Sequence, residues 1–160
     1  MRSDALALGL AVLLTAGAAR ADFAAGARAY DGGDYPTAFA EWMAIAKAGD
    51  PNAQTAIAGM YRFGEGRNPD AAAAVRWYRR AARKGDSVAQ MNLGEMYMRG
   101  MGVRRDTVRA WMWLTRASRQ GRTWATERLR DLEIRMTPQQ RAMGAALLED
   151  SSLKDLGPKK

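Results

Sequence analysis

The segment AQMNLGEMYMRGMGV, residues 89–103, carries the strongest structural signal in this chain. Ala89, Leu93 and Tyr97 are spaced four residues apart, so they lie on one face of a helix. Gly100 follows, and a residue without a side chain readily takes the left-handed conformation that closes a helix. The segment therefore predicts a helix followed by a glycine-rich loop.

The same pattern recurs with a period of 36 residues. When the sequence is shifted against itself by this amount, Gly, Ala and aromatic residues align without a gap. The matched columns are Ala53/Ala89/Ala125, Ile57/Leu93/Leu129, Tyr61/Tyr97, Gly64/Gly100, Gly66/Gly102, Asp34/Asp70/Asp106, Ala38/Ala74/Ala110, Trp77/Trp113 and Gly49/Gly85/Gly121. Self-similarity at a fixed period is the signature of a repeat protein, in which stacked units bury a continuous core.

Each period predicts two helices. In the first full repeat, the second helix begins near Asp70, because its carboxylate can cap the helix and the preceding Pro69 suits a helix start. Gly85 ends that helix. Its buried stripe is predicted to contain Ala74, Trp77, Tyr78, Ala81 and Ala82. We therefore expect an all-α fold of antiparallel helix pairs.

The two ends of the array differ from its middle. Near the start, Tyr30 lies only four residues before Asp34, so the long glycine loop is missing and a short turn is expected. Near the end, Thr137 and Gln140 form a capping-box pattern, which predicts a further helix to about Glu149. This helix is expected to cover the exposed end of the stack, as solenoids require.

The N-terminus is typical of a signal peptide, residues 1–21. Arg2 supplies a positive end, an apolar stretch follows, and residues 19–21 (ARA) give an A-x-A cleavage site. The apolar stretch is shorter than the roughly 20 residues that a membrane-spanning helix needs. We therefore expect cleavage between Ala21 and Asp22, which yields a periplasmic or secreted protein.

The mature chain is expected to form one repeat domain, residues 22–149. Its units are predicted at about 23–50, 51–86, 87–122 and 123–149, the last of them including the C-terminal helix. Residues 150–160 are expected to form a flexible tail. No other segment is long and apolar enough to suggest a membrane span.

The motif A-x-x-x-L-G-x-x-Y-x-x-G-x-G-V of residues 89–103 resembles the Sel1-like repeat (SLR) family of tetratricopeptide-like (TPR-like) proteins, in its exported bacterial type. The motif continues through Asp106, Ala110, Trp113, Ala117 and Gly121. The resemblance covers residues 24–135, with departures at Ala58 and Arg67. It implies a right-handed α-α superhelix, or solenoid, in which the first helix of each pair lines a concave groove. It also implies an adaptor that binds a protein or peptide.

No catalytic constellation is visible in the sequence. The chain has no His and no Cys, which removes the commonest general base, the thiolate nucleophile and the commonest metal ligands. The G-x-G pairs lack the G-K-[ST] ending of a phosphate loop. Ser151 and Lys154 match an S-x-x-K pattern, but its S-D-N and K-T-G partners are missing. We expect a non-enzymatic protein without a cofactor or metal.

The expected groove supplies the first set of candidate site residues. Positions between the buried columns of the first helices should face a partner, and they are Thr55, Arg62, Met91, Glu95, Met98 and Arg99. Methionine side chains adapt to varied partner shapes. The alternative for Met91 and Met98 is that they only pack against neighbouring helices.

A second set of candidates comes from the charge. The chain carries 25 basic and 17 acidic side chains, a formal net charge of +8. Arginines at helical spacing on the second helices form a predicted convex ridge: Arg76, Arg79, Arg80, Arg83, Arg116 and Arg119. The ridge suggests an alternative function, in which an envelope-associated protein binds cell-wall glycan or an anionic membrane surface. It is also compatible with a solvated face, and the export signal argues against nucleic acid as a partner.

Overall fold

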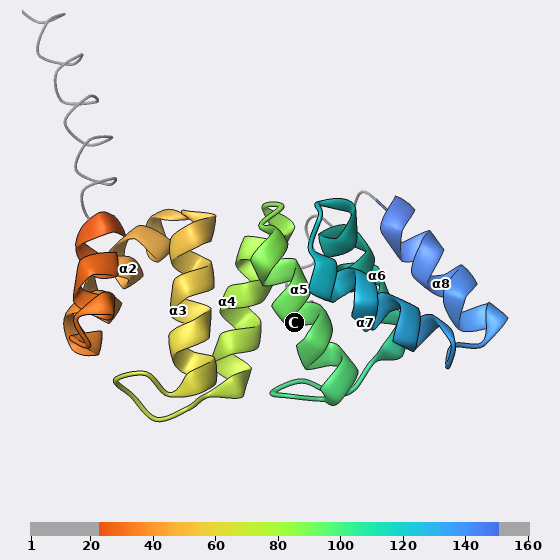
Figure 1. Cartoon of the computed structure of the whole chain (residues 1–160), viewed down its shortest axis with the longest axis horizontal. Helices are drawn as coiled ribbons and strands as arrows, with labels where there is room; N and C mark the ends of the chain where they lie inside the picture. Colours follow the sequence, from red (N-terminus) through yellow and green to blue (C-terminus); the bar gives the residue numbers. More distant parts are fainter. Residues whose placement is uncertain (1–22, 151–160) are drawn as a thin grey trace, which may run out of the picture.

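The computed structural model describes residues 23–150, which form helices joined by turns and contain no strand (Figure 1). Residues 23–31 are helical. The helices that follow are α2 (Tyr35–Ala48), α3 (Pro51–Phe63), α4 (Ala71–Arg83), α5 (Ser87–Arg99), α6 (Thr107–Arg119), α7 (Thr123–Glu133) and α8 (Pro138–Glu149). The predicted all-α fold is confirmed. The predicted signal peptide and residues 151–160 lie outside the described part of the chain.

The helices are stacked along the long axis of the molecule, from the N-terminal helices at the left of Figure 1 to α8 at the right. Helices α6 and α7 overlap in this view, and α8 packs against α6. Short turns at residues 49–50, 84–86 and 120–122 lie along one edge, the upper one in Figure 1. The glycine loops at residues 64–70 and 100–106 lie along the opposite edge. Consecutive helices are therefore antiparallel, as the sequence predicts.

Aspartates begin most of these helices. In each case the carboxylate accepts a hydrogen bond from a backbone N–H three residues further on, which satisfies a donor that the helix itself cannot. The pairs are Asp34 with Thr37, Asp50 with Ala53, Asp70 with Ala73, Asp86 with Ala89 and Asp106 with Arg109. Helix α7 differs, because Arg122 stands at its N-cap and makes no capping bond. The predicted caps at Asp70 and Thr137 are confirmed.

The core is divided into two clusters along the row. One cluster centres on Trp42, Ile45 and Ile57 in the N-terminal part, and the other runs from α4 to the C-terminal end. Half-buried Tyr61 and Trp77 pack against both clusters. Within the predicted stripe of α4, four of the five residues are buried, whereas Trp77 is half-buried and connects the clusters.

Each glycine loop rests on the start of the preceding second helix. A side chain on Gly66, whose φ is +68°, would place its Cβ 2.5 Å from the Cβ of Tyr35. One repeat later, a Cβ on Gly102 would overlap the backbone of Ala71. Tyr35 and Ala71 are themselves 36 residues apart, so the same contact is made twice. These glycines are needed because the backbones approach too closely for any side chain.

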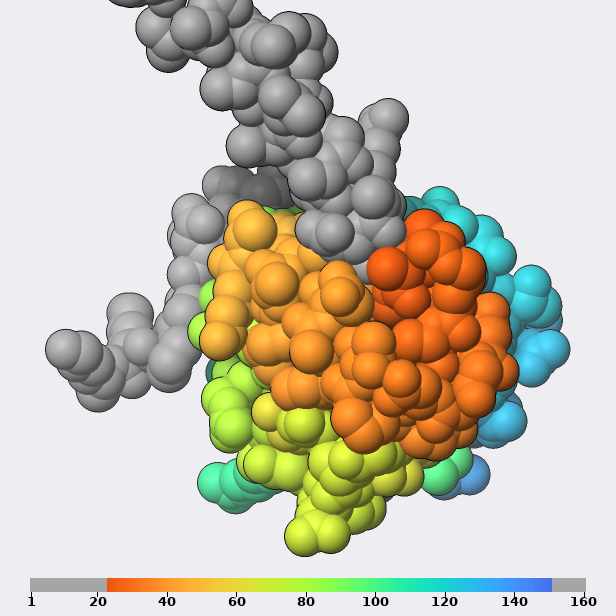
Figure 2. Space-filling model, turned by 90° about the vertical axis from the view of Figure 1, so that its left-hand side faces the viewer, coloured from red at the N-terminus to blue at the C-terminus, as the bar shows by residue number. Residues whose placement is uncertain are grey.

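The first loop has a further attachment to the N-terminal unit. The guanidinium of Arg67 lies 3.2 Å from the ring centre of Phe39 and 4.4 Å from that of Tyr61. The Tyr30 hydroxyl donates to Glu65 across 2.6 Å. In the end-on view of Figure 2, the N-terminal helices cover the end of the stack and the yellow-green segment that includes this loop projects below them.

Helix α8 closes the C-terminal end of the described row. Thr137 and Gln140 form the predicted capping box, with both hydrogen bonds present. Gly144 packs on the ring of Trp111 in α6, where a Cβ would come within 2.5 Å of the ring. Between residues 23 and 150, no helix combines the length and the apolar character that a bilayer crossing requires.

Candidate interaction surfaces

The predicted groove residues lie on α3 and α5, the first helices of the two full repeats, and α7 is the first helix of the next unit. Their outward positions fall into columns 36 residues apart, so the junction of α3 with α5 and the junction of α5 with α7 can be compared position by position. The columns are Thr55/Met91/Glu127, Gly59/Glu95/Asp131 and Arg62/Met98/Ile134.

At the α3–α5 junction, the predicted groove residues bind one another. Arg62 donates to Glu95 across 2.6 Å and to Asn92 across 2.7 Å. The side chains of Arg62 and Glu95 are only 10% and 12% exposed, so this is a nearly buried ion pair. Arg99 adds a second ion pair to Glu95 at 3.1 Å, and its own side chain is 58% exposed. The cluster joins two consecutive repeats through charged side chains.

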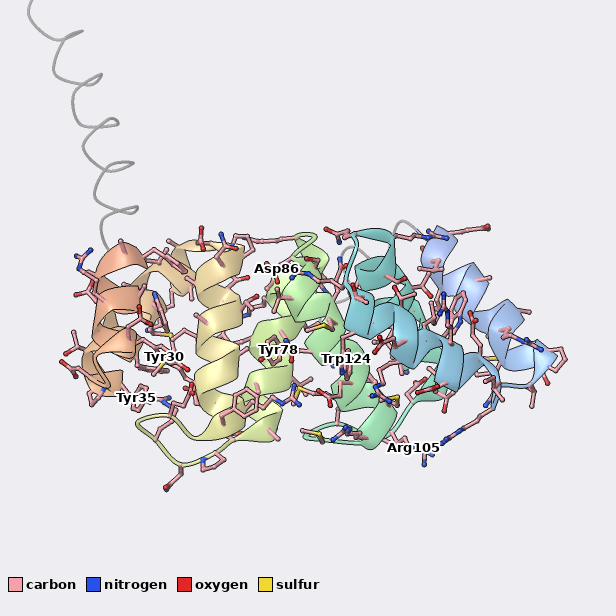
Figure 3. All side chains as sticks on the ribbon, viewed as in Figure 1. Tyr30, Tyr35, Tyr78, Asp86, Arg105 and Trp124 are labelled. Atoms are coloured by element: carbon pink, nitrogen blue, oxygen red, sulfur yellow. The ribbon has the colours of Figure 1, made fainter. Side chains whose placement is uncertain are left out.

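Tyr78 of α4 lies beneath this cluster. Figure 3 shows it between α3 and α5, and a Cβ added to Gly59 would come within 3.8 Å of its hydroxyl oxygen. Burial raises the pKa of Tyr78 to about 12, and the positive charge of Arg62 opposes part of this rise. The hydroxyl therefore stays protonated beside the ion pair.

Thr55 is also engaged within the chain. Its hydroxyl donates to the Asp86 carboxylate across 3.0 Å, and the same carboxylate caps α5 through the N–H of Ala89. One hydrogen-bonded unit thus connects α3 to the start of α5. Because Thr55, Arg62 and Glu95 all have internal partners, a ligand at this junction would have to displace existing bonds.

The α5–α7 junction is built from different side chains. Met91 and Met98 are half-buried and pack against the main core from the α5 side. Trp124 of α7 is half-buried against the same core, with the Arg128 guanidinium 5.5 Å from its ring centre. Arg122, which precedes α7, donates from its Nε to the Ser87 hydroxyl at the start of α5 across 2.8 Å. At the far end of α7, Ile134 is 84% exposed. Apolar surface therefore reaches solvent at this junction.

The predicted groove residues thus divide into two groups. Thr55, Arg62 and Glu95 serve the contact between α3 and α5, and Arg99 joins them through its ion pair with Glu95. Met91 and Met98 fill space at the next junction and remain partly accessible. Sequence reasoning missed Trp124, because no aromatic residue occupies its column in the other units.

The predicted arginine ridge also divides. Arg76, Arg80 and Arg119 are exposed. The Arg79 guanidinium instead donates to the Tyr97 hydroxyl across 2.9 Å, and Arg83 is half-buried. Burial and the neighbouring charge of Arg119 lower the pKa of the half-buried Arg116.

The described residues offer no cluster of three or more acidic side chains that could hold a metal ion. Ser151 and Lys154, which match the S-x-x-K pattern, lie outside the described range.

The Sel1 repeat family model matches residues 51–86 and 87–121. The chain is similar to a Sel1 repeat protein from Oxalobacter formigenes, with 34% identity and a TM-score of 0.67 over 78% of this chain and 96% of that one. It is also similar to c5321, a protective antigen of uropathogenic Escherichia coli displaying an SLR fold, with 31% identity and a TM-score of 0.76. That match covers 81% of this chain but 29% of the longer antigen.

A comparison with curated proteins gives no match. The two family matches coincide with the two full repeats, and both similar structures are Sel1 or SLR solenoids. Sel1 repeats are generally protein–protein interaction modules and typically non-catalytic scaffolds. The chain belongs to the Sel1 repeat family, with the right-handed α-α superhelix of helix pairs that defines that fold.

Proposed function

We propose that this chain is an exported adaptor that binds a segment of a partner protein across the α5–α7 junction. The observation that carries the proposal is the change of side chains between equivalent junctions. The first junction is closed by the Arg62–Glu95 ion pair, whereas Met98 occupies the Arg62 column at the second. Accessible Met and Trp side chains are enriched in the cores of protein interfaces.

The physical basis is that a partner can bind at the α5–α7 junction at a lower free-energy cost than at the α3–α5 junction. Displacing Arg62 from Glu95 would leave a charge in a nearly buried place without its partner, which is expensive. Met91 and Met98 hold no such bonds and can adjust their rotamers to a partner. Arg99, one residue after Met98, is exposed but already pairs with Glu95 at the first junction. A short helix or extended segment fits a surface of this size.

The export part of the proposal rests on residues 1–21. Their positive start, apolar stretch and A-x-A site support cleavage before Asp22 and release into the periplasm. The test is expression of the full chain in a Gram-negative host, followed by fractionation and mass spectrometry. A mature protein that begins at Asp22 in the periplasmic fraction is expected, and an uncleaved cytoplasmic chain would contradict export.

Binding is tested with a photo-crosslinking amino acid placed at Met98. The matched control carries the same amino acid at Arg76, an exposed position on α4. The expected result is a specific crosslinked partner from position 98 only, and its loss when Met91 is changed to Lys in the same protein. Equal crosslinking from both positions, in protein with unchanged helical circular dichroism, would contradict a binding site at this junction.

A further inference from the structure

The second helices end, and the short turns lie, along one edge of the molecule (Figure 1). The last turns of these helices and the turns that follow them carry cationic residues. Lys47, Arg83 and Arg119 occupy one column of the repeat, in the last turns of α2, α4 and α6. Further cations lie one turn before them or in the turns after them. We call the whole set the turn edge, and it consists of Lys47, Arg80, Arg83, Lys84, Arg116, Arg119 and Arg122.

Within residues 23–150, few acidic residues belong to the helix ends and turns of this edge. Helices α4 and α6 contain no Asp or Glu. Asp50 and Asp86 lie in the turns, but each carboxylate accepts the backbone N–H that begins the next helix, and Asp86 also accepts from Thr55. Glu149 and Asp150 end α8, beyond α6 in the row. The turn edge therefore carries a net positive charge along its length.

Two arginines of the turn edge are held in place by tryptophans. Arg80 lies with its guanidinium carbon 4.6 Å from the ring centre of Trp77, and Arg116 lies 5.1 Å from that of Trp113. Both pairs occupy the same columns. Stacking on a ring fixes a guanidinium while its N–H groups remain free for an anion. The repeat thus presents oriented donors at regular intervals.

The opposite edge has a different charge pattern. Its glycine loops mix Arg104 and Arg105 with Asp106, and Arg109 pairs with Asp106 at 2.5 Å. Arg67 lies between two aromatic rings. Figure 3 shows the two edges apart, with Asp86 at the upper one and Arg105 at the lower one. Net positive charge of the molecule is therefore gathered at the turn edge.

We propose that the turn edge binds an extended polyanion, a linear polymer with a phosphate or carboxylate group in each repeating unit. Cations that recur with the protein repeat match such a chain, whereas a single phosphate would engage only one unit. A bilayer is less well matched, because the large exposed apolar side chains of the described residues do not lie at this edge. Phe63 ends α3 and Ile134 follows α7 at the other edge, and Met143 lies within α8. This surface meets the proposed α5–α7 junction at Arg122, whose Nε donates to the Ser87 hydroxyl at the start of α5.

The test uses the mature full chain with polyphosphate and polygalacturonate as probes and neutral dextran as the blank. The turn-edge variant is Lys47→Gln, Arg80→Gln and Arg119→Gln. The matched control is Arg104→Gln, Arg105→Gln and Arg135→Gln, which removes the same charge from exposed positions elsewhere. Affinity is measured between about 50 and 200 mM salt, because each released counterion steepens the salt dependence.

The turn-edge variant is expected to bind both polymers at least about 10-fold more weakly with a shallower salt slope, and the control to lose less than about 3-fold. Equal losses in the two variants would show that net charge alone drives binding and would overturn the proposal. So would binding to phosphatidylglycerol vesicles without binding to either polymer, or inorganic phosphate competing as well as the polymers do. Melting temperatures confirm that both variants are folded.

Discussion

The junctions of α3 with α5 and of α5 with α7 share one backbone plan but differ in chemistry. Buried Gln54 and Gln90 donate to the carbonyls of Ala46 and Ala82, so the contacts next to the core repeat from unit to unit. On the outward side the side chains differ between the units, because Arg62 of the first junction is replaced by Met98 in the second. Packing requirements maintain the inner columns, and the outer columns are free to change.

The outward side chains serve the contact between repeats at the first junction, and at the second junction they are available for binding. Where the outer columns hold Arg62 and Glu95, the side chains stabilise the contact between repeats. Where they hold Met98 and Asp131, no pair forms across the helices, and Asp131 binds Arg128 of its own helix at 3.0 Å. We therefore expect the first junction to respond strongly to mutation in stability and the second to respond mainly in binding.

The largest expected effect comes from Glu95→Ala. It leaves the Arg62 charge nearly buried without its carboxylate, so the free energy of unfolding should fall by about 3–5 kcal/mol. Urea unfolding followed by circular dichroism measures the change. The control is Arg62→Met with Glu95→Leu, which gives position 62 the residue of its column in the second junction and removes both charges. It should recover most of the loss, and a double variant as unstable as Glu95→Ala would contradict this account.

The next effect is a pH dependence that only the first junction has. The Tyr78 hydroxyl ionises near pH 10 in the unfolded chain and near pH 12 in the folded one, and Leu114 stands in its column one repeat later. The folded state holds the proton longer, so the stabilisation is complete below pH 10 and is lost as pH rises towards 12. The loss should approach about 2.7 kcal/mol.

The control for this prediction is Tyr78→Phe. The raised pKa of Tyr30, which is also about 12, affects both proteins and cancels in the comparison. Unfolding free energies measured from pH 8 to 12 should therefore fall more steeply in the wild type than in the variant. Parallel curves would exclude the buried hydroxyl as the source.

A smaller effect is expected at the start of α5, where Asp86 connects this helix to Thr55 of α3. Asp86→Ala removes the cap of α5 and the acceptor of Thr55, whereas Asp50→Ala removes only the equivalent cap of α3. Each cap is worth about 1 kcal/mol, and the Thr55 bond adds up to about 1 kcal/mol. Thermal unfolding should rank Asp86→Ala below Asp50→Ala, and equal melting temperatures would show that the Thr55 bond contributes nothing.

The smallest expected effect is a gain at the second junction. Arg122 stands where Asp50 and Asp86 cap the other first helices, and α7 has no side-chain cap. Arg122→Asp gives up the exposed hydrogen bond that Arg122 donates to Ser87 across 2.8 Å, but its carboxylate can accept the N–H groups of the first turn. A net stabilisation of about 0.5 kcal/mol is expected. Arg122→Gln, which removes the same positive charge without supplying a good cap, should bring no such gain in melting temperature.

The inner columns made the fold predictable from sequence. Gly64 and Gly100 both end helices in the left-handed conformation, with φ of +74° in each case. Thr137 and Gln140 identified α8 because a capping box involves only local contacts. Such signals depend on spacing along one helix or on one period, and both can be read directly from the chain.

The pairing of outward side chains was not predictable in the same way. Arg62 and Glu95 are 33 residues apart and belong to different columns, so aligning the repeats does not bring them together. Their contact depends on the stagger between α3 and α5, which a one-dimensional period does not contain. For the same reason, sequence reasoning placed Arg62 and Glu95 facing a partner, whereas each faces the other.

The seating of Gly66 on Tyr35 and of Gly102 on Ala71 has a consequence for how such a gene can change length. The second helix of each unit supports the glycine loop of the unit after it. An in-frame duplication of residues 51–86 would therefore supply both a new loop and a new supporting helix in a single event. Insertions of other lengths would leave a glycine loop without its supporting helix. The array is therefore expected to gain or lose whole units. The 36-residue period is kept because each glycine loop must contact the start of the preceding second helix.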